Sequence, residues 1–130
     1  METGIKGHIE VIVDEKNIAS SLGSGAVDVF ATPCLIGIME EASQTSVAPY
    51  LEEGMTTVGT KLNVSHDAAT PVGMKVRAES ELIEIDGRRL VFDVKAYDEC
   101  GLIGQGIHER FIVRLDRFME KAKAKKNITL

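Results

Sequence analysis

The stretch FATPCLIGIMEEASQTSVAPYLEEG, residues 30–54, decides the fold because its pattern is that of one long covered helix. Thr32 can cap the free backbone N–H groups at its start, and Pro33 suits the first helical position. Apolar and small residues recur at three- and four-residue spacing, which predicts a broad buried stripe. The stripe contains Leu35, Ile36, Met39, Ala42, Ser43, Ser46, Val47 and Tyr50. Pro49 predicts that the regular helix loosens at its end and finishes in a turn closed by Gly54.

The residues that flank the helix alternate with a period of two, which predicts strands. Residues 8–13 form a short half-buried strand, and residues 20–29, which are rich in Gly and Ser, form a loop before the helix. After Gly54 a strand presents one dry face to the helix. The residues on that face are Val58, Thr60, Leu62, Val64 and His66. His66 ends this strand, so we expect its ring to point towards the helix.

Three more strands are predicted in the second half of the chain. They cover residues 74–85, 89–99 and 102–115. Tight turns at Asp86-Gly87 and Cys100-Gly101 join them into antiparallel neighbours.

The order of elements is one strand, one long helix and then four strands, which is typical of an α+β fold. We expect a single domain over residues 1–130, in which an antiparallel sheet curves around one central helix. Gly104 and Gly106 predict a bulge or bend in the last strand. Residues 116–126 are typical of a short basic surface helix.

The composition argues against two kinds of partner. A net charge of -5 disfavours nucleic acid, because general binders of the phosphate backbone need a positive footprint. Lys and Arg residues gather near the C-terminus, where they fit the solvated face of the last helix better than a phosphate site. They are Arg114, Arg117, Lys121, Lys123, Lys125 and Lys126. No apolar run is long enough to span a bilayer, so we expect no membrane partner.

The two cysteines, Cys34 and Cys100, lie far apart and show no CxxC or Cys/His spacing. This pattern suggests neither a disulfide framework nor a metal site. The first 15 residues are too charged for a signal peptide. We therefore expect reduced thiols, a cytoplasmic location and no bound metal.

The helix carries two adjacent carboxylates, Glu40 and Glu41, which helical geometry turns about 100° apart. Glu41 lies in a polar row, whereas Glu40 shares the row of Ile36, Ser43 and Val47. Drier surroundings make a carboxylate more basic, as a general base near neutral pH requires. Pattern alone favours equally a boundary glutamate that pairs with a neighbouring Lys or Arg.

His66 and Thr32 are the other candidate site residues. An imidazole close to Glu40 suits acyl transfer, because it can donate a hydrogen bond or a proton to developing negative charge. A structural histidine and a simple helix cap are the alternatives that pattern alone leaves open. The free N–H groups at the helix start could also hold an oxyanion, and Cys34 at the same helix end is a rival nucleophile. No base precedes Cys34 in the helix, which favours the Glu/His pair.

Five stretches of the chain carry a resemblance to a known family. They are VFATPCLIGIMEEASQTSVAPYLEEG (29–54), the glycine in TVGTKLNVSH (57–66), SHDAATPVG (65–73), EIDGRRL (84–90) and GQGIHERF (104–111). Together they resemble the fluoroacetyl-CoA thioesterase-like family of hot-dog proteins, from about Phe30 to Arg117 and without gaps. The resemblance implies a hot-dog fold and a homodimer with active sites near the subunit interface, with a tetramer as a further possibility.

The resemblance also implies hydrolysis of a small acyl-CoA thioester, with coenzyme A entering only as part of the substrate. The family's catalytic Thr, Glu and His fall on Thr32, Glu40 and His66. Its thioester-contacting glycine falls on Gly59, and the arginine of its HER motif falls on Arg110. We therefore expect Glu40 and His66 to meet in one sheltered pocket, where Glu40 attacks the carbonyl or activates water.

The chain departs from the family's pattern around the acyl pocket. The fluoroacetyl-selective member has a longer, phenylalanine-bearing lid where this chain has residues 20–29, and Glu41 stands at an aromatic position. Pro33 and Cys34 also differ, so the acyl group does not carry over. A non-catalytic dimer that binds acyl-CoA or an acyl carrier is the alternative function. A hydratase is disfavoured, because no Asp and His lie five positions apart on a helix.

Overall fold

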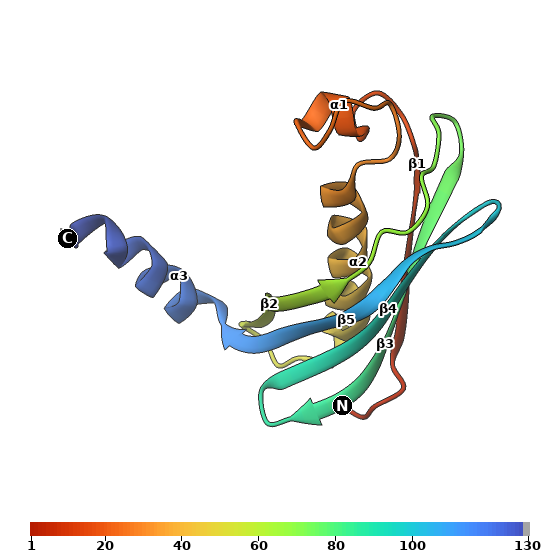
Figure 1. Cartoon of the computed structure of the whole chain (residues 1–130). Coiled ribbons are helices and arrows are strands. Elements are labelled where there is room, and N and C mark those ends of the chain that lie inside the picture. The colour runs from red at the N-terminus through yellow and green to blue at the C-terminus, as the bar shows by residue number, and fades with distance from the viewer. Residues whose placement is uncertain (129–130) are drawn as a thin grey trace.

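The computed structural model describes residues 1–128 and shows one long helix packed against a five-stranded sheet. The helices are α1 (Ala19–Leu22), α2 (Thr32–Val47) and α3 (Leu115–Ala124), with 3-10 turns at Ala48–Tyr50 and Lys125–Asn127. The strands are β1 (Lys6–Ile12), β2 (Met55–Val64), β3 (Lys75–Asp86), β4 (Arg89–Asp98) and β5 (Gly101–Arg114). The sheet curves around α2, as Figure 1 shows, which confirms the predicted α+β architecture.

The strands lie in the order β1-β3-β4-β5-β2, and every neighbouring pair is antiparallel. β1 and β2 are therefore the two edges of the sheet. Residues 59–63 of β2 are all exposed, and they include the large apolar side chain of Leu62. An uncovered edge strand offers unpaired backbone N–H and C=O groups to another chain.

The core lies between α2 and the concave face of the sheet. Its helical members are Leu35, Ile38, Met39, Ala42 and Val47, and they meet Leu82, Leu90, Phe92 and Val94 of the strands. The predicted buried stripe is confirmed for most of its length, but Tyr50 is 58% exposed. α2 ends at Val47, and the 3-10 turn that follows carries Tyr50 out of the stripe.

The start of α2 differs from the prediction by one residue. Ala31, in an extended conformation, is the N-cap residue, so the prediction that the Thr32 side chain caps the helix is wrong. Pro33 is accordingly the second helical residue. The preceding stretch is also not all loop, because α1 forms there and Gly23, with φ of 68°, ends it in the left-handed conformation.

β2 breaks its predicted alternation at a bulge between Gly59 and Lys61. The predicted dry face is wrong for most of this strand, because Thr57 on the opposite face is buried whereas Thr60 and Leu62 are exposed. An extra residue in one strand shifts the period of two and bends the strand.

The glycines of β5 allow the end of β2 to cross it closely. A Cβ atom at Gly106 would overlap the carbonyl oxygen of Asn63, and one at Gly104 would overlap that of Ser65. The predicted irregularity is found next to Gly104, between the pairs Ala96–Gly104 and Tyr97–Leu102. Beyond this crossing, the chain brings His66 to the start of α2.

Candidate active site

Thr32 and His66 form a hydrogen-bonded pair at the N-terminal end of α2. The Oγ1 atom of Thr32 lies 2.7 Å from Nδ1 of His66. The pair lines a cavity of about 210 Å³, whose other walls come from the α1 loop and the segment after His66. These walls include Val27, Val29, Phe30, Ala68 and Ala69.

The second ring nitrogen of His66 is buried and has no hydrogen-bond partner among residues 1–128. Burial lowers the pKa of the imidazole, and the backbone of Ala68 and the charge of Asp67 oppose this shift. We assign the neutral ring with Thr32 donating to Nδ1, which places the proton on Nε2. That N–H is then free to donate to a substrate oxygen.

Glu40 lies on another part of α2, next to β2 and β5. Its side chain is 40% exposed, and its Oε2 atom lies 3.6 Å from Nη1 of Arg110. It also borders Gly59, since a Cβ atom added there would lie 2.7 Å from Oε2. Glu41 is exposed, as predicted. The expectation of dry surroundings holds for Glu40 only in part, because the carboxylate is reached by water.

Arg110 is held by a buried network beneath Glu40. Its Nε donates to Oγ1 of Thr57 at 2.8 Å, and its Nη2 donates to the carbonyl oxygen of Thr57 at 2.9 Å. Nη1 lies 3.2 Å from Nε2 of His108. With its planar donor set fixed in this way, the guanidinium keeps a positive charge facing the carboxylate of Glu40.

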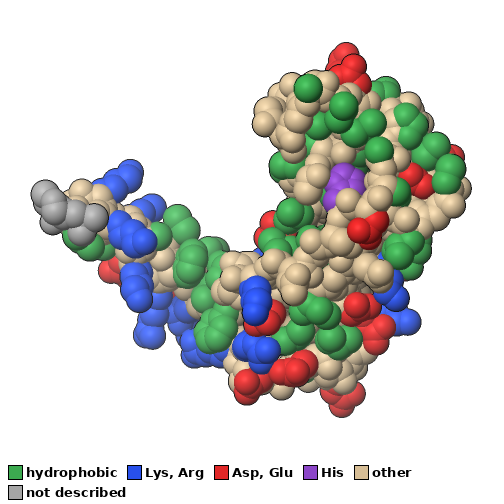
Figure 2. Space-filling model, viewed as in Figure 1, with side chains coloured by type: hydrophobic (Ala, Val, Ile, Leu, Met, Phe, Trp, Pro, Cys, Tyr) green, Lys and Arg blue, Asp and Glu red, His purple; other side chains and the backbone are tan. Residues whose placement is uncertain are grey.

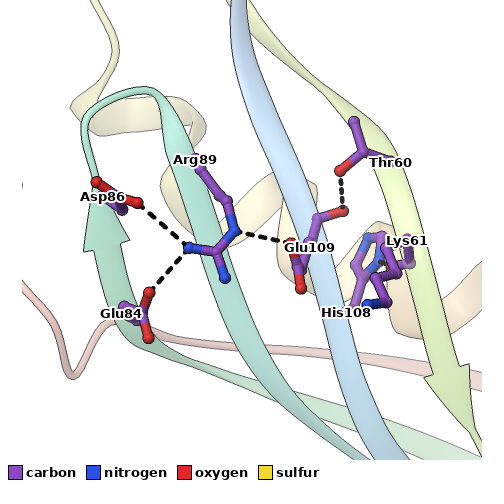
Figure 3. A network of polar contacts seen from close by, with 7 residues as sticks. All are labelled: Thr60, Lys61, Glu84, Asp86, Arg89, His108 and Glu109. Atoms are coloured by element: carbon purple, nitrogen blue, oxygen red, sulfur yellow. Dashed lines mark hydrogen bonds and ion pairs between the residues drawn. The ribbon is translucent and has the colours of Figure 1, made fainter.

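His108 joins this network to the bulge of β2. Its Nδ1 lies 2.8 Å from the carbonyl oxygen of Lys61, which can only accept, so Nδ1 carries the proton and Nε2 accepts from Arg110. Figure 3 shows the ring on β5 beside Lys61 on β2. On the neighbouring strand Arg89 binds three carboxylates, those of Glu84, Asp86 and Glu109.

The chain does not bring all its predicted site residues together. Thr32 meets His66, and Glu40 meets Gly59 and Arg110, but no hydrogen bond or ion pair joins the two groups among residues 1–128. Glu40 lies eight positions after Thr32 in the helix, which corresponds to about 12 Å along the axis. One chain therefore joins Glu40 to His66 by no direct contact, and their meeting in one pocket stays a prediction. The sequence pattern indicated which faces of the helix and strands point inward. It does not indicate which turn of α2 each strand residue lies beside.

Two alternatives from the sequence are disfavoured. Burial raises the pKa of the Cys34 thiol, and the charge of Asp14 raises it further, so Cys34 is not an activated nucleophile. The N–H groups of Cys34 and Leu35 both donate to the carbonyl oxygen of Ala31, and Pro33 has none. The start of α2 therefore offers few free donors to an oxyanion.

Thr57 was not singled out from the sequence, although both its hydroxyl and its carbonyl hold Arg110. The predicted alternation placed Thr57 on the wet face of the strand, so no sequence signal pointed to it. Within residues 1–128 no group of three or more His, Cys, Asp or Glu side chains is arranged to hold a metal ion. Over the same residues no helix has the length and apolar character needed to cross a membrane.

Gly59→Ala should lower kcat/KM by about 10- to 100-fold, because a misplacement of about 1 Å has effects of this size. The new methyl group would force Oε2 of Glu40 to move and would press on Cε1 of His108 at 3.3 Å and Nη1 of Arg110 at 3.4 Å, so we also expect a small loss of melting temperature. Steady-state thioester hydrolysis and thermal melting measure the two effects. Gly37→Ala on α2 is the control, since nothing lies within 4 Å of its added Cβ atom. Equal activity of the two variants would contradict the contact.

The free energy of unfolding should fall as the pH drops below about 6.5, the ordinary pKa of histidine. Burial lowers the pKa of His108, as does Arg110, while the Lys61 backbone, Glu40 and Glu109 raise it. The unfolded chain therefore binds the proton at a higher pH than the folded chain, and acid favours unfolding. Urea titrations at several pH values measure this slope. They run from about 5 to about 7.5, which brackets the titration range of histidine.

His108→Gln should reduce that slope, and the part that remains belongs to His66, whose pKa burial also lowers. His8→Gln should leave the slope as it is, because His8 lies exposed on β1. Identical slopes for the wild-type protein and His108→Gln would show that the ring is not held neutral by the fold.

Known proteins are similar to this chain in sequence and in structure. The family model of fluoroacetyl-CoA-specific thioesterases matches residues 13–116. A fluoroacetyl-CoA thioesterase from Streptantibioticus cattleyicolor is 44% identical over 98 residues, which cover 75% of this chain and 70% of that protein.

Solved structures of related proteins are also similar to this chain. A variant of a fluoroacetyl-CoA-specific thioesterase in complex with fluoroacetate and CoA is 37% identical, with a TM-score of 0.85 over 91% of this chain and 99% of that one. A hot-dog-like protein from Thermanaerovibrio acidaminovorans, 21% identical, superposes with a TM-score of 0.87 over 96% of this chain and 93% of its own. The latter likeness bears on the fold alone, and it confirms the hot-dog architecture.

Proposed function

Because this chain belongs to the family of fluoroacetyl-CoA-specific thioesterases, we propose that its active site is shared between two subunits of a homodimer. The chain is a hydrolase that cleaves the thioester of a small acyl-CoA to the free acid and CoA. Hydrolysis is favoured over mere binding of an acyl-CoA, because the relatives are named thioesterases. Glu40 of one subunit and the Thr32–His66 pair of the other act on one carbonyl group.

The observation that carries this proposal is the separation of the two groups beside an open edge strand. Residues 59–63 of β2 are exposed on the edge next to the Glu40 group. Antiparallel pairing of β2 with its copy continues the sheet and hides both edges. A two-fold symmetric register with Leu62 opposite Leu62 of the partner subunit places Gly59 opposite the partner's Ser65, next to the partner's His66. Each Glu40 then faces a Thr32–His66 pair across the dimer axis.

In this site the substrate carbonyl lies against Gly59, whose missing side chain lets the backbone N–H approach it. Glu40 accepts a proton from a water molecule, and the hydroxide adds to the carbonyl carbon. The partner's His66 donates its Nε2–H to the negative oxygen, and Thr32 orients the ring. The C–S bond then breaks and the CoA thiolate leaves, which a thiol with an ordinary pKa near 8.5 does readily.

Hydrolysis of short, branched and aromatic acyl-CoAs in H₂¹⁸O tests the activity and the role of Glu40 together. We expect CoA release with at least one short acyl group and ¹⁸O only in the free acid after a single turnover, because water is the nucleophile. Mass spectrometry of the acid and of the peptide that contains Glu40 measures the label. Label in Glu40 would contradict the general-base role, and no CoA release with any thioester would overturn the activity.

We also place the protein in the cytoplasm. Cys34 and Cys100 are both free thiols, and reduced cysteines are typical of that compartment.

A further inference from the structure

Helix α3 leaves the body of the subunit at the open edge of the sheet. Figure 1 shows it continuing from the end of β5 and projecting away from α2, and Figure 2 shows a hollow between this arm and the body. None of its residues is buried. Its tie to the body lies at its base, where the N–H of Leu115 donates to the carbonyl oxygen of Gly54.

The arm has an apolar stripe without a partner in its own chain. Leu115, Phe118 and Met119 share one side of α3 and are 50%, 40% and 41% exposed. A helix of ten residues is only marginally stable in water unless its apolar face is packed. The stripe therefore needs a surface that covers it.

The arm and the rest of the chain carry net charges of opposite sign. Residues 114–130 contain six Lys or Arg against two acidic residues, which gives +4, whereas the whole chain carries -5. Residues 1–113 therefore carry -9. The body of a second copy is thus electrostatically attractive to the arm.

The β2 pairing proposed above determines which part of the second copy lies beside α3. Met55 at the start of β2 pairs with Arg114, the residue before α3. In an antiparallel pair the start of one β2 lies beside the residues that follow the end of the other. Those residues, 65–72, include exposed Val72 (54%). The bridge between Val29 and Pro71 brings in the α1 loop, with exposed Val27 (56%).

We propose that α3 of each subunit crosses the dimer seam and packs its apolar stripe on the partner's α1 loop and the segment after the partner's His66. Asp28 and Asp67 lie exposed in the segments so covered, where their charge is opposite to that of the arm. Since Val27 and Ala69 line the cavity beside Thr32 and His66, the arm completes the outer wall of the partner subunit's acyl cavity. This inference rests on the proposed dimer.

Disulfide trapping tests the contact directly. A Met119→Cys chain and a Val27→Cys chain, both also carrying Cys100→Ser, are mixed and mildly oxidised. We expect a linked dimer in which mass spectrometry finds position 119 joined to position 27. Leu102→Cys mixed with Val27→Cys is the control, because Leu102 is equally exposed (42%) at the far β4–β5 turn. Linkage no greater than in this control would overturn the proposal.

The double variant Phe118→Ser/Met119→Ser gives a second readout. It should raise the dimer dissociation constant by at least about 10-fold, because two large apolar side chains lose their burial. Sedimentation equilibrium measures the constant, and Leu102→Ser should leave it unchanged. An unchanged constant for the double variant would count against the arm. Neither measurement uses catalysis, so failure of the arm and failure of the thioesterase mechanism are distinguishable.

Discussion

Glu40→Gln should lower kcat by about 10²- to 10⁴-fold on any acyl-CoA that the wild-type protein hydrolyses, which is the range for loss of a general base. The amide keeps the size of the side chain and its place beside Gly59 and Arg110 but cannot accept a proton from water. Its half-exposed position predicts little change in melting temperature. Steady-state release of CoA measures the rate.

Glu41→Gln is the matched control for this prediction. It removes the same charge from the next residue of α2, whose side chain is exposed and lies outside the Arg110 network. We expect wild-type turnover. Wild-type kcat in Glu40→Gln, or equal losses in the two variants, would remove Glu40 from the mechanism.

His66→Ala should lower kcat by about 10²- to 10³-fold, the usual effect of removing one donor to a developing oxyanion. Thr32→Val should cause a smaller loss of kcat. The imidazole ring remains, but it loses the 2.7 Å hydrogen bond that joins its Nδ1 to the Thr32 hydroxyl in the wild-type protein. Thr32→Ser keeps the hydroxyl and should recover most of the rate. The measurement is kcat at saturating substrate, with melting curves to confirm folding.

A rise in KM with kcat unchanged in His66→Ala would contradict the role of the imidazole. It would mean that the ring helps to bind the substrate but does not stabilise charge in the transition state. Equal rates for Thr32→Val and Thr32→Ser would separately show that the hydroxyl does not orient the ring.

Much of the fold could be predicted because the residue patterns are local. The three- and four-residue spacing of Leu35, Met39 and Ala42 defined the buried side of α2, and Asp86-Gly87 marked the hairpin that joins β3 to β4. The N-cap was missed because Ala31 has no side chain that signals the role. Thr32, which carries such a side chain, bonds His66 instead.

The candidate site was harder to predict because it depends on distances between elements. The faces of Glu40 and His66 follow from periodicity, but the bulge after Gly59 and the crossing at Gly106 fix where β2 ends. No local pattern encodes that position along α2. The buried bonds from Arg110 to Thr57 likewise join strands that are far apart in the sequence.

Subunit complementation tests the shared site most directly. Glu40→Gln and His66→Ala chains, each inactive alone, are mixed, dissociated and reassembled, and hydrolysis is measured. Random pairing makes half of the dimers mixed, each with one intact site of two, so we predict recovery of about a quarter of wild-type activity. His66→Ala mixed with Thr32→Val should show no activity beyond the average of the two variants, since both defects fall in the same half-site and no intact site forms. No recovery with the first pair would contradict a site shared between subunits.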